Sequence, residues 1–559
     1  MPRTRSLLAA AVVAALLAGT CGESGLSRED ASGGALPPEQ NASTFAITRY
    51  AFRFDLTSAR METELTVELG GDGGNCVTLE SALPLETPPL WGSAAGRVSR
   101  DGERLRICSD RLPQKGTVRI TTTSIVREGR DPTTFQVGYF KQADRDGHLV
   151  TELVSWLGGC RLFGPCETGL APQVEIDVMV SHAPDVTVLC AGTREIVATG
   201  THCRIGGAER APLYSGLTIA AHPAYARNDW LDGPTGRIVL FEPAPGRLAS
   251  ALNRDSARAA LDFMTGLLGP LPYGAELRVG VVPLGWMGFE PPANLLLDDR
   301  LPEWSMWDYA RPAQHTLVHE LAHQWAGDRV TMVHPRDVLW KEAIAEYLAY
   351  LIEEQQGAPG EAAVTRRGWQ RSAQLASWWP LALDADVPAN VLAANAVAVG
   401  PMTLFVQLEP YVGRAALLAA VRDFLAVPGA RTTADLRAAI ERASGVPLAT
   451  YWVTWIEGSG EPVRPELDVQ AEPDTVTITQ MQAAAPLPIE IEVDLVGANR
   501  RVRVPVRFDL DAPLRAMTVP HGLGEPVLET TIDPDARALW LRWLNTDRWA
   551  AGERQGDRP

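Results

Sequence analysis

Two histidines and a glutamate near the middle of the chain stand at the spacing of a metal site. His319 and His323 are four positions apart, so a helix over residues 312–326 would place both imidazoles on one face, where they can reach a single Zn²⁺. Glu320 follows His319 directly and would point beside that metal. It cannot be a third ligand from there, but it can hold and deprotonate a zinc-bound water.

Glu342 supplies the third ligand in this prediction. It follows His323 after eighteen intervening residues and begins a second segment with a helical apolar period. Two packed helices would bring its carboxylate to the two imidazoles. Two histidines and one glutamate leave the fourth tetrahedral position open, which is typical of a catalytic rather than a structural zinc. The alternative is a helix with core histidines, in which the glutamates and the spacing coincide by accident.

The elements that must position these residues change in type along the chain. Residues 45–240 alternate polar and apolar side chains in short runs, which predicts an antiparallel β domain. Helical periods dominate residues 241–457. Within that range we expect a helix at 249–268 and strands at 277–282 and 293–297. Alternation returns in residues 462–549 and predicts a small β-sandwich, so the fold class is α+β and multidomain.

Both ends of the chain are predicted to lie outside these domains. Residues 1–21 combine two arginines, an apolar run and small residues, which is the layout of an export signal too short to span a bilayer. Cys21 follows Leu17-Ala18-Gly19-Thr20, which looks like a bacterial lipoprotein cleavage box. Residues 22–44 are typical of a flexible tether and residues 550–559 of a polar tail. We expect a cell-envelope lipoprotein anchored at Cys21 or, as the alternative, a secreted protein.

The net charge and the cysteine content limit which binding partners and which cellular compartment are expected. The net charge is −17 and no run of lysine or arginine is present, which argues against nucleic acid as a partner. Six further cysteines fall within residues 45–240, and an exported chain favours disulfides between them. Neighbours in the sequence suggest the pairs Cys76–Cys108, Cys160–Cys166 and Cys190–Cys203. A membrane contact is expected only through a lipid on Cys21.

Several of these segments resemble the aminopeptidase N family of zinc metallopeptidases, the gluzincins that also include the leukotriene epoxide hydrolases. The resemblance is carried by Leu268-Gly269-Pro270-Leu271-Pro272-Tyr273, His319-Glu320-Leu321-Ala322-His323-Gln324-Trp325, Asp337 and Glu342. It implies an N-terminal β saddle domain and a thermolysin-like domain that holds one Zn²⁺ through His319, His323 and Glu342, with Glu320 as the base. The chain looks like a short, exported bacterial form without the C-terminal helical domain, and we expect a monomer with an open cleft.

The family's Gly-Ala-Met-Glu-Asn strand corresponds here to Met287-Gly288-Phe289-Glu290-Pro291. The resemblance implies that Glu290 binds the free α-amine of a peptide. It also implies that Gly288, one place later than the family's glycine, lets the substrate backbone run close to the strand. A carboxylate one residue's length from the metal selects an N-terminal ammonium by charge-assisted hydrogen bonding. The alternative is a solvated loop carboxylate before Pro291.

One part of the family pattern is missing. The family places a tyrosine downstream of the zinc glutamate, and its hydroxyl stabilises the oxyanion of the tetrahedral intermediate. The equivalent segment is Ala396-Val397-Ala398-Val399-Gly400-Pro401, so Val397 occupies the tyrosine's position. The loss of one such donor costs roughly two to three orders of magnitude in rate.

Two more residues are candidates for contacts with the metal ligands. His315, one turn before His319, and Glu346, one turn after Glu342, can each hydrogen-bond a group of the site and fix its orientation. The alternatives are a core histidine and an exposed helix carboxylate. We therefore predict a zinc aminopeptidase, slow if Val397 replaces the tyrosine, that acts on peptides with a free N-terminus. The rival hypotheses are a zinc-containing peptide-binding protein without fast turnover and an endopeptidase.

Overall fold

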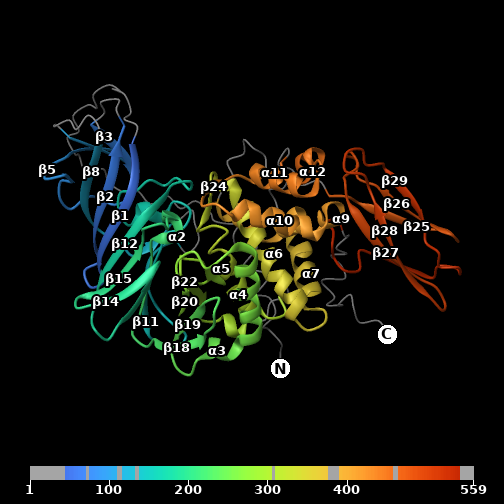
Figure 1. The fold of residues 1–559 in the computed structure, drawn as a ribbon, viewed down its shortest axis with the longest axis horizontal. Coiled ribbons are helices and arrows are strands. Elements are labelled where there is room, and N and C mark those ends of the chain that lie inside the picture. Colours follow the sequence, from blue (N-terminus) through green and yellow to red (C-terminus); the bar gives the residue numbers. More distant parts are fainter. Residues whose placement is uncertain are drawn as a thin grey trace, which may run out of the picture. The chain divides into compact units, whose positions relative to one another are not determined.

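The computed structural model describes residues 45–70, 75–109, 116–131, 137–304, 309–374, 389–457 and 464–541. These residues belong to one compact unit that combines helices with several β-sheets (Figure 1). The predicted export signal with Cys21, the tether and the polar tail lie outside the described residues. The domain limits at 240 and 457 stay predictions. In the described part of the chain, no helix is both long and apolar enough to cross a membrane.

The N-terminal part is built from strands, as the period-two pattern predicts. Its nine-stranded sheet contains β14 (Thr193–Val197), β15 (Gly200–Ile205), β12 (Gln173–Ser181), β1 (Phe45–Asp55), β2 (Arg60–Leu69), β8 (Gly116–Ile125), β4 (Leu90–Trp91) and β5 (Ala94–Ala95), with β16 (Ala211–Pro212) paired to β12. β1 and β12 pair in parallel, so the prediction of a purely antiparallel domain is wrong. A parallel pair needs a long crossover rather than a hairpin, and these two strands are separated by more than a hundred residues.

Two smaller sheets complete the N-terminal part. One contains β13 (Thr187–Cys190), β17 (Thr218–His222), β11 (Leu149–Val154), β10 (Gly138–Ala143) and β9 (Gly129–Arg130), and the other β3 (Cys76–Glu80), β7 (Arg104–Cys108) and β6 (Arg97–Asp101). All three suggested disulfides are present: Cys76–Cys108 joins paired strands β3 and β7, Cys160–Cys166 closes a short loop, and Cys190–Cys203 joins β13 to β15. These bonds are typical of a protein in an oxidising compartment.

A five-stranded sheet leads into the helical part. It has the order β18 (Ala226–Leu231), β19 (Arg237–Glu242), β20 (Glu276–Val282), β22 (Asn294–Asp298) and β21 (Gly288–Phe289). The three central strands are parallel and the two edge strands antiparallel. β20 and β22 confirm the two strands expected between residues 277 and 297. Both are buried along nearly their whole length, which is typical of parallel strands and agrees with their mainly apolar sequence.

The helices of the metal region follow this sheet. They are α3 (Arg247–Ala251), α4 (Arg254–Leu268), α5 (Pro312–Ala322), α6 (Val338–Gln356), α7 (Glu361–Ala373), α8 (Ala389–Pro401), a π-helix (Met402–Val406), α9 (Glu409–Val412), α10 (Arg414–Leu425), α11 (Thr433–Ser444) and α12 (Ala449–Trp455). The single helix expected at 249–268 is interrupted, because Asn253 caps α4 by accepting a hydrogen bond from the Ser256 amide. α5 packs against α6 (Figure 1).

α5 ends at Ala322, four residues before the predicted end of the metal helix. His323 still has helical dihedral angles, but its Nδ1 lies 2.8 Å from the carbonyl oxygen of Ala326, and the chain then turns at Gly327 with φ of 134°. The turn delivers β23 (Val330–Met332) to its parallel partner β24 (Gly429–Arg431). A long-range strand pair therefore ends the helix earlier than its local sequence indicates.

The C-terminal part contains two three-stranded antiparallel sheets. They consist of β25 (Leu467–Ala471), β26 (Thr475–Gln480) and β29 (Ala516–Pro520), and of β28 (Arg501–Arg507), β27 (Glu490–Val496) and β30 (Glu529–Ile532). Each sheet buries one side of its central strand, for example Val476 and Ile478 in β26 and Ile491 and Val493 in β27. This alternation is the signal that predicts the strands.

Glu152 on β11 gives a stability prediction. It is fully buried. Burial and the charges of Asp298 and Asp299 raise its pKa to about 8, although a hydrogen bond from Gln142 acts to lower it. The folded state therefore holds this proton more tightly than the unfolded chain, whose value is 4.5. The free energy of unfolding should fall as the pH rises from about 4.5 to 8 and then level off. The E152Q variant stays neutral, so it should gain stability over the wild type across this window, as measured by urea unfolding at pH 5, 6, 7 and 8.

Candidate active site

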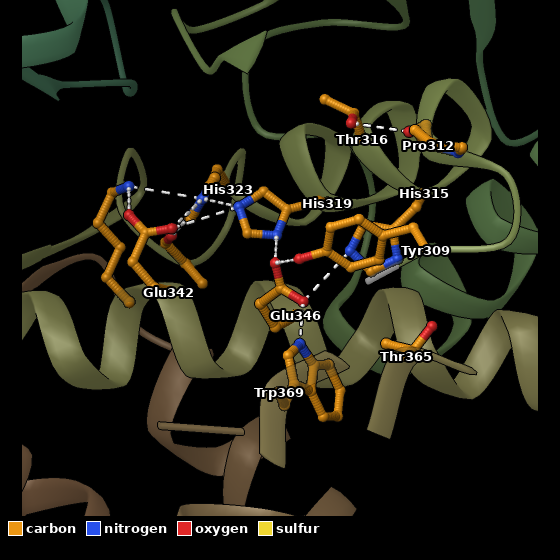
Figure 2. A network of polar contacts seen from close by, with 12 residues as sticks. Tyr309, Pro312, His315, Thr316, His319, His323, Glu342, Glu346, Thr365 and Trp369 are labelled. Carbon is orange, nitrogen blue, oxygen red and sulfur yellow. Dashed lines mark hydrogen bonds and ion pairs between the residues drawn. The ribbon is translucent and has the colours of Figure 1, made fainter. Parts of the chain in front are cut away.

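Helices α5 and α6 bring the three predicted metal ligands together. Nε2 of His319 and Nε2 of His323 are 3.0 Å apart, and each lies 3.3 Å from Oε2 of Glu342. The three side chains are at most 10% exposed. Figure 2 shows both imidazoles turned toward Glu342. Three donor atoms from two helices thus face one small volume.

The ring nitrogens that point away from this volume have their own partners. Nδ1 of His323 contacts the carbonyl oxygen of Ala326, so it carries the proton and leaves a lone pair on Nε2. Nδ1 of His319 lies 3.2 Å from Oε1 of Glu346. A metal-binding histidine usually donates its second N–H to a carbonyl or carboxylate. His323 has such a carbonyl partner, and Glu346 lies at ion-pair distance from His319. Both imidazoles are therefore oriented to offer Nε2 to a cation.

The donor set fits Zn²⁺. Zinc binds histidine nitrogen and carboxylate oxygen at about 2.0 to 2.2 Å in a tetrahedron, which separates neighbouring ligand atoms by about 3.3 Å. The observed separations of 3.0 and 3.3 Å match that spacing. Burial alone would raise the pKa of Glu342, but Lys341 and His323 hold it well below its usual value, so the carboxylate is ionised. Two neutral imidazoles and one carboxylate would leave one position for a ligand.

Glu346 lies at the centre of a buried polar network behind His319. Its carboxylate accepts hydrogen bonds from the Tyr309 hydroxyl at 3.1 Å and from the Trp369 indole at 2.9 Å, and it contacts His315 at 3.2 Å (Figure 2). His315 also bonds Glu353 at 2.8 Å. Burial would lower the pKa of His315, but Glu346 and Glu353 raise it to about 9. Because Glu346 is itself buried, the interpretation of this residue as an exposed helix carboxylate is wrong.

This network predicts that Glu346 supports metal binding. The E346Q variant would remove the charge that faces Nδ1 of His319. The loss of a carboxylate behind a metal-binding histidine typically costs ten- to a hundredfold in metal affinity. We expect that increase in the zinc dissociation constant, measured by competition with a chelator. E353Q is the matched control, because Glu353 contacts His315 from its other side, so its effect should be smaller; equal effects would contradict the prediction.

Glu320 lies beside the presumed ligands, as predicted. One of its carboxylate oxygens and a ring nitrogen of each histidine lie within 4.8 Å of one another. Burial raises the pKa of Glu320 to about 8, an effect that His319 opposes and the charges of Glu290 and Glu342 increase. The side chain also fills the space in front of Gly288 on β21, where a Cβ would lie 2.5 Å from Oε1 of Glu320. A glycine at 288 therefore leaves room for the carboxylate, and its predicted role toward a substrate backbone stays a prediction.

Glu290 is buried at 4% exposure, so it is no solvated loop carboxylate. Two residues for which the sequence predicts no role contact Glu290. The Gln324 amide donates to the backbone carbonyl of Glu290 at 3.2 Å and accepts from the Ala293 amide at 2.7 Å. Lys341 places Nζ 2.8 Å from Oε1 of Glu290. Gln324 directly follows His323, and Lys341 directly precedes Glu342. Their position next to predicted ligands is the signal in the sequence that could have identified them.

Val397 lies half-buried on α8. Three residues further on, Gly400 meets α6 so closely that a Cβ there would lie 2.8 Å from the Cβ of Ala343. Residues three apart on a helix share a face, and Ala343 directly follows Glu342. The face of α8 that carries Val397 and Gly400 is therefore turned toward the segment of α6 that carries Glu342.

A second histidine and aspartate cluster lies in the N-terminal part. Oδ2 of Asp144 is 2.9 Å from Nδ1 of His148 and 3.1 Å from Nε2 of His222. Nδ1 of His222, however, accepts a hydrogen bond from the Ala224 amide at 3.0 Å. The proton of His222 must then be on Nε2, where it is donated to Asp144, so this cluster is tied by hydrogen bonds and lacks the free lone pair that His323 offers.

Comparisons with known proteins agree with this geometry. Residues 290–391 match the peptidase family M1 domain. Aminopeptidase N from Streptomyces lividans is 33% identical over 172 residues, which cover 28% of this chain and 20% of that protein. The tricorn protease-interacting factor F2 from Thermoplasma volcanium is 28% identical over 157 residues, or 26% and 20% of the two chains. The matched region thus spans about a fifth of these relatives.

The fold has a counterpart among solved structures. Aminopeptidase A from Legionella pneumophila, in complex with aspartic acid, aligns with a TM-score of 0.70 at 16% identity and covers 90% of this chain and 60% of that one. The fold of this chain is thus similar to that of an aminopeptidase, and residues 290–391 are similar to the peptidase family M1 domain. Part of the chain is similar to the aminopeptidase N family of M1 peptidases, as its motifs predict.

Proposed function

We propose that this protein is a zinc-dependent aminopeptidase that hydrolyses the N-terminal bond of peptides. The observation that carries the proposal is the convergence of His319, His323 and Glu342 on one volume, with the carboxylate of Glu320 beside it. The partial sequence similarity to an aminopeptidase N and the similarity in fold to an aminopeptidase A support the same reaction.

The chain's own residues can carry the proton transfers and the recognition steps. Bound Zn²⁺ would polarise the scissile carbonyl and acidify a water molecule. Glu320 would accept the proton of the attacking water as a general base and deliver it to the leaving amine as a general acid. Glu290 would bind the substrate ammonium through its carboxylate. The burial of both glutamates strengthens these interactions, because few water molecules compete for them.

The remaining properties of the proposal follow from the sequence. Val397 supplies no hydroxyl, so turnover would be slow. The expected layout is an N-terminal saddle, a thermolysin-like zinc domain and a small C-terminal sandwich in a monomer. The protein would be exported and either lipid-anchored at Cys21 or secreted, and the three disulfides favour such an oxidising location.

Two rival functions would use the same site. Val397 favours a zinc-containing protein that binds peptide N-termini without fast turnover. An endopeptidase would follow if Glu290 did not block the extension of the substrate beyond its first residue. Both rivals keep the metal, so a test must separate turnover from recognition of the amine.

The test compares free and blocked substrates. Zinc-replete protein is incubated with a panel of aminoacyl fluorogenic substrates and their N-acetylated counterparts. Release from the free-amine substrates only supports the aminopeptidase. Equal cleavage of blocked peptides would favour the endopeptidase, and the absence of release with stoichiometric zinc would favour the binding protein.

The E290Q variant tests the amine contact in the same assay. Glutamine keeps the shape of the side chain but removes the charge that would bind the ammonium. A hydrogen bond to a charged group contributes about 1.5 to 3 kcal/mol, so kcat/KM on free-amine substrates should fall about ten- to a hundredfold. Any residual cleavage of acetylated substrates should be unaffected. An equal loss on both kinds of substrate would contradict the proposed role.

A further inference from the structure

Lys341 is a buried cation between two functional carboxylates. Its side chain is 1% exposed, and Nζ lies 2.8 Å from Oε1 of Glu290 and 2.7 Å from Oε1 of Glu342. Nζ is also 3.5 Å from Nε2 of His323. A buried ammonium is costly unless carboxylates pair with it, and here one carboxylate comes from α6 and the other from the end of β21.

The turn after α5 is shaped to admit the lysine stem. Gly327 has φ of 134°, and a Cβ at this residue would lie 2.8 Å from Cε of Lys341 and 3.4 Å from Cδ and Cγ. The carbonyl of Gly327 accepts a hydrogen bond from the Tyr214 hydroxyl at 2.6 Å, which fixes this wall. The aliphatic stem is therefore confined along most of its length, and the ammonium is held at one place.

The ammonium uses only one oxygen of each carboxylate. Oε2 of Glu342 faces the two imidazoles while Oε1 faces Lys341. Glu290 likewise turns Oε1 to Lys341, and no hydrogen bond to its Oε2 occurs among the described residues. Each glutamate thus has one oxygen anchored by Lys341 and one oxygen free for a separate partner. A lysine ammonium suits this task because it is a compact charge with three donors.

We propose that Lys341 is a positioning residue that links the metal ligand Glu342 to the amine-binding Glu290 and fixes the distance between them. The inference rests on the proposed function, since it assigns the oxygen of Glu290 that Lys341 leaves free to the substrate amine. The free amine of a peptide is then recognised at a set distance from the metal, and a disturbance of either glutamate is transmitted to the other through one side chain.

The test uses full-length K341M, E290Q and the double variant, with K141M as the control. Methionine keeps a long flexible stem without the charge. Lys141 on β10 lies over the Tyr139 ring and is no member of the proposed site. For each protein two quantities are measured: the zinc dissociation constant by chelator competition, and KM and kcat on aminoacyl anilides with and without an N-acetyl group.

We expect K341M to raise the zinc dissociation constant at least tenfold and KM for free-amine substrates at least tenfold, with a smaller change in kcat. In the double variant, the changes that K341M and E290Q cause in these two constants should be less than additive, because both substitutions break the same link. The double variant has one unpaired buried carboxylate fewer than K341M. If K341M does not fold, the zinc dissociation constant is therefore measured on the double variant.

Three results would overturn the inference. One is a K341M protein with the zinc affinity and amine selectivity of K141M. Another is strict additivity in the double variant. A third is a lower KM for free amines in K341M, because Nζ would then occupy the substrate amine's place and compete with it. If the wild type cleaves no substrate, the proposed function fails, while the zinc constants of the single and double variants still decide the link.

Discussion

Replacement of Glu320 by glutamine is expected to lower kcat on a free-amine substrate by about two to four orders of magnitude. The variant keeps the size of the side chain, so the space in front of Gly288 stays filled. It loses the group that would take the proton of the attacking water and return it to the leaving amine. The measurement is steady-state hydrolysis with zinc-replete E320Q across pH 6 to 9.

Zinc content separates a catalytic loss from a structural one. E320Q should still bind one zinc per chain, because the three presumed ligands are unchanged. The control E68Q removes an exposed carboxylate on β2 and should leave kcat as in the wild type. A wild-type rate in E320Q would show that another base acts in this site. Loss of zinc from E320Q would mean that Glu320 contributes to the metal site itself.

Substitution of Val397 by tyrosine should have the largest effect in the opposite direction. If its hydroxyl reaches the developing oxyanion, one added donor is worth roughly two to three orders of magnitude, so kcat should rise by about a hundred- to a thousandfold. The position is suitable, because Val397 is half-buried and shares a face of α8 with Gly400, which meets α6 at Ala343. KM should change little, because the new contact would form mainly in the transition state.

V397F is the matched control for this prediction. It adds the same ring without the hydroxyl, so it reports any effect of bulk on the packing of α8 against α6. A gain in V397Y that is absent from V397F assigns the effect to the hydroxyl. An unchanged or lower kcat in V397Y would count against the placement of this segment opposite the metal.

The convergence of the three proposed metal ligands could be predicted from the sequence because their spacing is largely local. An i, i+4 histidine pair on one helix is fixed by the helical period, and the spacing brings in Glu342 through a single helix contact. The disulfides were predictable for a similar reason, since Cys76 and Cys108 lie on neighbouring strands of one small sheet. Local periodicity also predicted β20 and β22.

The features that could not be predicted depend on long-range contacts. The parallel pairing of β1 with β12 joins distant parts of the chain. The early end of α5 depends on the strand that follows Gly327 and on its partner at Gly429–Arg431. The burial of Lys341 depends on a carboxylate about fifty residues earlier, at Glu290. Charged residues are usually solvated in helix patterns, so no local signal placed this lysine inside the site.

The pairing of the six cysteines in the N-terminal part makes fluorescent labelling of the helical part simple. Among the described residues, every thiol is consumed in a disulfide. A single cysteine introduced at exposed Val453 on α12 would therefore be the one reactive thiol of the described part. A maleimide dye at that position could report on zinc or peptide binding by energy transfer from the protein's tryptophans, without reduction of the native bonds.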